Sequence, residues 1–168
     1  MDYDYGALAH LNWEIQSMQR GSMHKMVSSV GLYMGQPWIL RFIRNQGEVT
    51  QTQIADALMI SPATVANSLK RMNKSGLITR KVDQADTRKN NVVLTAQGES
   101  VLSDFEAALR AHEEAMYQGI TRKQLDVFKA ALEKIKQNLE DMGAEKEFGR
   151  RNYGPKGQNG RRGKDIDD

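Results

Sequence analysis

The sequence contains no cysteine, only three prolines and few aromatic residues. The lack of cysteine excludes disulfides, thiolate metal sites and sensing through thiol oxidation. No apolar run is long enough to span a bilayer and no signal peptide is visible, so we expect a cytoplasmic protein. The 168 residues are enough for one domain with a substantial core and are few for two.

Motifs of catalysis are also missing. The sequence has neither a Gly-rich phosphate loop nor a nucleophile elbow. Its three histidines, His10, His24 and His112, lack the spacing of a metalloprotease motif, and a metal site assembled from them in three dimensions stays open as an alternative. We therefore expect no enzyme, no metal ion and no cofactor.

The region between Thr50 and Gly98 carries four short signals in one order. An amphipathic segment at 52–58 precedes a polar break at 60–62 and a second amphipathic segment at 63–72. A basic, Gly-punctuated ribbon follows and ends at 92–98. Helix, turn, helix and basic hairpin in this order are typical of a winged helix-turn-helix that binds duplex DNA.

The second amphipathic segment has defined ends and two different faces. Ser61 fits the N-cap, Pro62 the first helical position and Gly76 the left-handed stop after the helix. One face is an apolar stripe of Val65, Leu69 and Met72. The opposite face is small near its start, which suits entry into a major groove about 12 Å wide.

The remaining side chains of this segment divide into two kinds of DNA contact. Asn67 is the best base-reading candidate, because a carboxamide can pair bidentately with adenine. Hydroxyl groups and positive charges suit phosphate oxygens, which fix the register of the protein on DNA. We predict a DNA-binding surface made of Ser61, Pro62, Ala63, Thr64, Asn67, Ser68, Lys70, Arg71 and Lys74.

Positive charge is concentrated in the same region. Strands are expected at 77–82 and 91–95, around a polar tip at 83–90. From Ser61 to Asn91, seven lysine and arginine residues stand against two aspartates, a net charge of +5, whereas the whole chain carries +3. An ordinary amphipathic core helix would explain the stripe, but this charge favours a phosphate-binding surface.

These residues resemble the MarR-type transcriptional regulators, over a stretch from about Ser22 to Leu139. Segments 61–65 and 74–80 match the recognition helix and the strand that leaves it. The most specific matches lie in and just after the wing, at Asp86-Thr-Arg88 and Leu94-Thr-Ala-Gln-Gly98.

The resemblance implies roles for the wing residues. Arg88 would enter a minor groove, whose negative potential attracts arginine, and Asp86 would hold its guanidinium in place. Thr87 stands where many members have a second arginine, so the charge of the wing depends on Lys89 instead. Thr95 would cap the following helix.

Apolar stripes at helical spacing flank this unit. A long helix is expected around Gly21, a second opens at Pro37, and Thr121 caps the last one. The last helix carries a heptad-like stripe of Leu125, Phe128, Leu132, Ile135, Leu139 and Met142. The stripes either bury within a single globule or pair two chains, and the resemblance favours a homodimer with interleaved terminal helices. Such a dimer would place two recognition helices about 34–36 Å apart, on a pseudo-palindromic site.

The resemblance also implies a small effector, such as an aromatic acid, bound between the dimerisation helices and the winged domain. The candidate ligand-binding residues are Trp13, His24, Tyr33, Met34 and Trp38, although such side chains at helix junctions are more often simple core.

We therefore expect a mainly α-helical protein in four parts: an N-terminal dimerisation helix (1–34), a winged helix-turn-helix domain (35–98), C-terminal dimerisation helices (99–142) and a disordered basic tail (143–168). The tail would add non-specific DNA affinity or have no role. The expected function is that of a sequence-specific regulator of the MarR type, acting on double-stranded DNA as a repressor and released or retuned by a small molecule. The alternative is a winged-helix protein-interaction module that sequesters another regulator without reading DNA.

Overall fold

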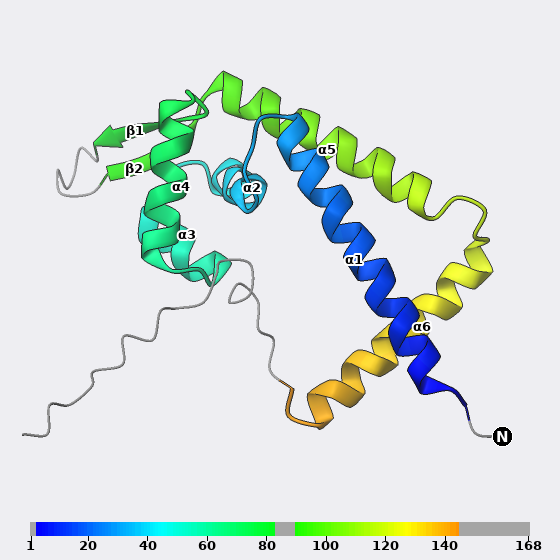
Figure 1. Ribbon diagram of the computed structural model, residues 1–168. Coiled ribbons are helices and arrows are strands. Elements are labelled where there is room, and N and C mark those ends of the chain that lie inside the picture. The colour runs from blue at the N-terminus through cyan, green and yellow to red at the C-terminus, as the bar shows by residue number, and fades with distance from the viewer. Residues whose placement is uncertain (1–2, 83–89, 145–168) are drawn as a thin grey trace, which may run out of the picture.

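The computed structural model describes residues 3–82 and 90–144, apart from the side chains of Val82 and Asn90. The predicted wing-tip residues Asp86, Arg88 and Lys89 and most of the predicted tail, 145–168, lie outside the described residues. The elements, in chain order (Figure 1), are α1 (Tyr5–Ser29), α2 (Gln36–Gln46), α3 (Gln51–Leu58), α4 (Pro62–Lys74), β1 (Ile78–Val82), β2 (Asn90–Leu94), α5 (Ala96–Met116) and α6 (Arg122–Asp141). The mainly α-helical winged helix-turn-helix architecture is confirmed.

The two strands form an antiparallel hairpin that packs beside the helices α2, α3 and α4. Ile78 pairs with Leu94 at one end, and Val82 pairs with Asn90 at the other. Val49, between α2 and α3, extends this sheet by exchanging two backbone hydrogen bonds with Val92, at N···O distances of 3.2 and 2.7 Å. The hairpin is therefore joined to the α2–α3 connection as well as to α4.

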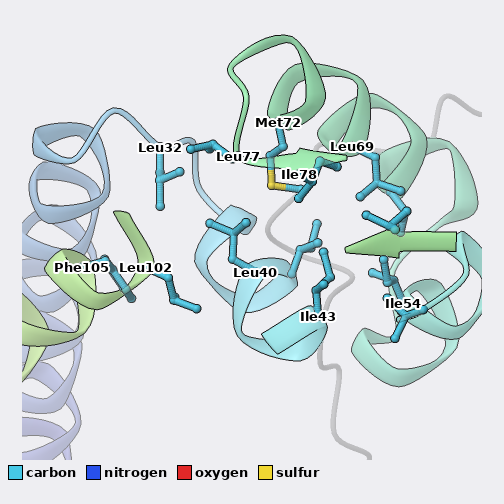
Figure 2. Packing of buried hydrophobic residues seen from close by; sticks show 14 of the residues in the cluster. Leu32, Leu40, Ile43, Ile54, Leu69, Met72, Leu77, Ile78, Leu102 and Phe105 are labelled. Carbon is cyan, nitrogen blue, oxygen red and sulfur yellow. The ribbon is translucent and has the colours of Figure 1, made fainter. Parts of the chain in front are cut away.

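One hydrophobic core holds the winged unit together. In Figure 2, Leu40 and Ile43 of α2 lie between side chains of α5 on one side and of α3 and α4 on the other. Leu102 and Phe105 of α5 are fully buried there, so the core extends into the first turns of α5. Because α5 shares this core, its start cannot move without affecting α2.

The two long terminal segments are also helical, as their sequence patterns predict. α1 is one continuous helix with Gly21 inside it, and Asp4 caps it by accepting the N–H of Ala7 at 2.9 Å. Thr121 caps α6 in a capping box with Gln124, as expected. α1 contacts α5, where Gln19 Nε2 lies 3.1 Å from Met116 Sδ. No helix among the described residues is both long and apolar enough to cross a membrane.

The apolar stripe of α6 is not covered by any other part of the chain that the structure describes. None of the residues of α6 is buried, and Leu132 at the centre of the stripe remains 47% exposed. Phe128, Ile135 and Leu139 are exposed to a similar extent, and so are Leu8, Leu11 and Ile15 on α1. Among the described residues, these stripes are therefore not buried within one globule, unlike in the alternative that every stripe buries there.

Candidate nucleic-acid interface

The helix α4 begins where the sequence predicts. The Ser61 Oγ accepts a hydrogen bond from the Thr64 backbone N–H at 3.1 Å, and Pro62 occupies the first turn. The Ser61 and Thr64 hydroxyl oxygens also lie 2.8 Å apart. This cap satisfies a backbone donor that would otherwise have no partner, so the start of α4 is fixed.

The two faces of α4 are sharply different. Val65, Leu69 and Met72 are fully buried against the core. Ser68 lies beside them and is only 9% exposed, so it is beneath the surface at which we predicted a phosphate contact. The buried arc of the helix is thus wider than the apolar stripe alone indicates. The other predicted residues are exposed or, for Thr64, half-buried, and they comprise Ser61, Pro62, Ala63, Asn67, Lys70, Arg71 and Lys74.

The turn before α4 has a strained backbone. Met59 has a φ of 51°, in the left-handed region, where a side chain is unfavourable. The Met59 N–H donates to the carbonyl oxygens of Ala55 and Asp56, and this residue is the C-cap of α3. The Gln51 Nε2 of α3 donates to the Pro62 carbonyl at 3.1 Å, which ties the two helices together directly.

The end of α4 is joined to the start of α5. Gly76 has a φ of 71° and stops the helix, as predicted. The Thr95 hydroxyl donates to the Gly76 carbonyl at 2.6 Å and accepts the Gly98 N–H at 3.0 Å, so the predicted cap of α5 is confirmed. The Thr95 N–H also donates to the Leu77 carbonyl at 3.1 Å. The bonds of Thr95 to Gly76 and Leu77 attach α5 to the segment that leaves α4.

Gly98 is required because of this attachment. A Cβ atom at this position would lie 2.0 Å from the Leu77 carbonyl oxygen and 3.1 Å from Leu94 Cδ2. The first distance is far below van der Waals contact and involves backbone. The close approach of two backbone segments therefore explains why the Leu-Thr-x-x-Gly element ends in glycine.

The basic side chains around α4 have few acidic neighbours. Lys70, Arg71 and Lys74 on α4 and Arg80 and Lys81 on β1 are all exposed. Within 3–82 and 90–144, none of the five forms an ion pair. No carboxylate of the described residues pairs with these charges, which can therefore bind anions such as phosphate.

A second charged cluster connects α2 to α5 and was missed by the sequence analysis. Glu106 Oε1 accepts Arg41 Nε at 2.9 Å and Arg44 Nη2 at 2.6 Å, and Arg44 Nη1 lies 3.5 Å from Glu99 Oε1. The hydrogen bond from Arg44 lowers the pKa of the Glu106 carboxyl, and burial opposes this shift. The hydrogen bond from Arg41 lowers the pKa further, so the net effect is a lowered pKa. The only sequence signal was the spacing of the charges, Arg41 to Arg44 and Glu99 to Glu106, on two amphipathic helices.

The predicted ligand-binding residues do not gather in one place within a single chain. Trp13 and His24 are exposed on α1, and their separation by 11 residues corresponds to about 16 Å along the helix. Trp38 packs edge-on against Phe105, with ring centroids 5.9 Å apart, and Arg41 lies over its ring. Tyr33 contacts Arg71, and Met34 follows it in the α1–α2 connection. Effector binding by these residues remains a prediction.

Comparisons with known proteins agree with this geometry. The sequence profile of the MarR family matches residues 31–89. The chain is 31% identical over 99 residues to the transcriptional regulator HosA of Escherichia coli O127:H6. This alignment covers 52% of this chain and 73% of HosA. The fold is similar to that of S. aureus MepR in a DNA complex, with a TM-score of 0.65 and 26% identity over 78% of this chain and 98% of MepR. YusO from Bacillus subtilis shares the fold alone, with a TM-score of 0.69 and 17% identity over 81% of this chain and 99% of YusO. The chain belongs to the MarR family of transcriptional regulators.

Proposed function

We propose that this regulator binds a pseudo-palindromic site on double-stranded DNA as a homodimer and inserts one α4 helix into each of two major grooves. The observation that carries the proposal is the exposed face of α4. It is small near Ala63, polar at Asn67 and basic from Lys70 onward, and both ends of the helix are fixed by hydrogen bonds. A helix that is rigidly attached can hold base-reading side chains in one register. The similar protein MepR was solved in a complex with DNA, which supports DNA binding by this chain.

The side chains of α4 would have different roles in DNA recognition. The Asn67 carboxamide would read one base edge, and Lys70 and Lys74, one turn apart on the same face, would bind phosphates beside the groove. At the wing, Arg88 would enter the minor groove, with Asp86 holding it and Lys89 adding charge.

The dimer would form through the terminal helices. The exposed stripes of α1 and α6 are apolar over several turns, and covering such surfaces is the main driving force of stable association. A two-fold dimer would place the two α4 helices about 34–36 Å apart, one turn of DNA.

The regulator would act as a repressor that a small molecule removes from DNA. Ligands held by residues such as Trp13, His24, Tyr33, Met34 and Trp38, contributed by both chains, would favour a dimer whose α4 helices are wrongly spaced. A differential affinity of about 1–3 kcal/mol would change the affinity for DNA roughly 5–150-fold.

Selection of binding sites from fragmented genomic DNA, followed by affinity measurements on the best fragment, tests this proposal. We expect an enriched pseudo-palindrome and a steep fall of log K with log salt concentration. With Asn67→Ala the preference at one base pair should fall by about 1–3 kcal/mol, whereas Lys70→Ala should weaken binding to all sequences alike. No enrichment, together with weak binding to every duplex, would instead point to a protein-interaction module.

A further inference from the structure

Tyr33, in the connection between α1 and α2, contacts the helix α4. The Cζ atom of Arg71 lies over the Tyr33 ring, 5.0 Å from its centroid. A guanidinium within about 6 Å of an aromatic centroid is attracted by the electron-rich face of the ring. The contact joins two segments that are 38 residues apart in the sequence.

The backbone of Tyr33 is fixed by hydrogen bonds, although the side chain of this residue is 60% exposed. The Tyr33 N–H donates to the Gln36 Oε1 at 2.9 Å, and Gln36 is only 3% exposed. The preceding residue, Leu32, is buried in the core, and its N–H donates to the Val27 carbonyl at 3.0 Å. The exposed ring is attached to a fixed backbone, and the residue that contacts it in this structure is Arg71.

The contact with Tyr33 leaves N–H donors of Arg71 available. The ring occupies only one side of the guanidinium, with 5.0 Å between Cζ and the ring centroid, and an arginine side chain carries five N–H donors. Among the described residues, no carboxylate pairs with Arg71. The guanidinium is therefore held in one place and still has its donors and its charge available for a phosphate.

We propose that Tyr33 is a positioning residue that presents Arg71 to a DNA phosphate at the edge of the groove that α4 enters. The inference rests on the proposed DNA-binding function. A free arginine loses rotamer freedom when it binds a phosphate, and stacking on Tyr33 removes part of that loss in advance. The role is distinct from effector binding, for which the sequence analysis selected Tyr33.

A double-mutant cycle on the best selected DNA fragment tests the inference. The variants are Tyr33→Leu, which removes the ring, Tyr33→Phe, which keeps it, Arg71→Ala, and Tyr33→Leu combined with Arg71→Ala. We expect Tyr33→Leu to weaken binding about two- to five-fold for each subunit, as for an exposed cation–π contact, and Tyr33→Phe to restore most of the affinity. In the Arg71→Ala background the change at Tyr33 should have no further effect.

The dependence of affinity on salt separates positioning from folding. Arg71→Ala should reduce the slope of log K against log salt by about 0.9 for each lost phosphate contact, and Tyr33→Leu should move the slope in the same direction. Thermal unfolding of each variant shows whether the fold is intact. Wild-type affinity or tighter binding for Tyr33→Leu would overturn the inference, and so would an effect that persists in the Arg71→Ala background. If the wild-type protein binds no duplex specifically, the proposed function fails instead.

Discussion

Replacing Gly98 by alanine tests the joint between the recognition helix and α5. The new Cβ would lie 2.0 Å from the Leu77 carbonyl oxygen and 2.9 Å from its carbonyl carbon, and neither atom belongs to a flexible side chain. The first turn of α5 would have to move away from Leu77. That movement would stretch the bonds from Thr95 to Gly76 and Leu77, which measure 2.6 and 3.1 Å.

The magnitude follows from three contributions. Overpacking costs about 1–3 kcal/mol, and loss of a partly buried hydrogen bond costs about 1 kcal/mol. The better helix propensity of alanine returns at most about 1 kcal/mol. With the full return from helix propensity, the net loss is about 1–3 kcal/mol, which corresponds to a decrease in Tm of roughly 2–12 °C for a chain of this size.

Thermal unfolding at equal protein concentration measures this effect, with Gly21→Ala as the matched control. Gly21 lies within α1, where an added Cβ would meet no described atom within 4 Å apart from its own turn of the helix, so alanine there should raise stability by about 0.5–1 kcal/mol. A Gly98→Ala protein as stable as the wild type would refute the reasoning about this joint.

Three other perturbations address separate parts of the structure. Met59→Gly should stabilise the protein by about 1 kcal/mol in thermal unfolding, because glycine accepts the φ of 51° without strain, and an unchanged or lower Tm would contradict this. Glu106→Gln should lower the Tm near neutral pH. Because the pKa of Glu106 is lowered from its ordinary 4.5, its contribution is complete above that pH and is lost as the pH falls through the folded-state pKa, so the two melting curves should converge in acid. Leu132→Glu, at the centre of the α6 stripe, should shift the protein from dimer to monomer in sedimentation equilibrium, and an unchanged mass would argue against that interface.

The sequence predicted the features that depend on local interactions. The caps at Ser61, Thr95 and Thr121 each need only a hydroxyl and an N–H three residues away, so the residue types suffice to find them. The stripe on α6 repeats at helical spacing and could be recognised for the same reason. The left-handed residue at the α3–α4 turn could not, because Met59 is neither glycine nor asparagine.

Contacts between segments that are distant in the sequence could not be predicted from it. Glu106 meets Arg41 and Arg44 only because α2 and α5 pack together, and Tyr33 meets Arg71 only because the α1–α2 connection lies beside α4. The burial of Ser68 has a similar origin, since the width of the buried arc depends on what surrounds the helix. The motif that contains Gly98 was recognised, but its reason, the approach of the Leu77 carbonyl, required the structure.

Hydroxyl-radical footprinting of the best selected DNA fragment, combined with the mass of the complex, tests the central claim most directly. Two chains per duplex and two protected segments, with centres about 10 bp apart, are the predicted result, because each α4 helix would occupy one of two successive major grooves. One chain per duplex, or protection that does not repeat with the turn of DNA, would contradict the account.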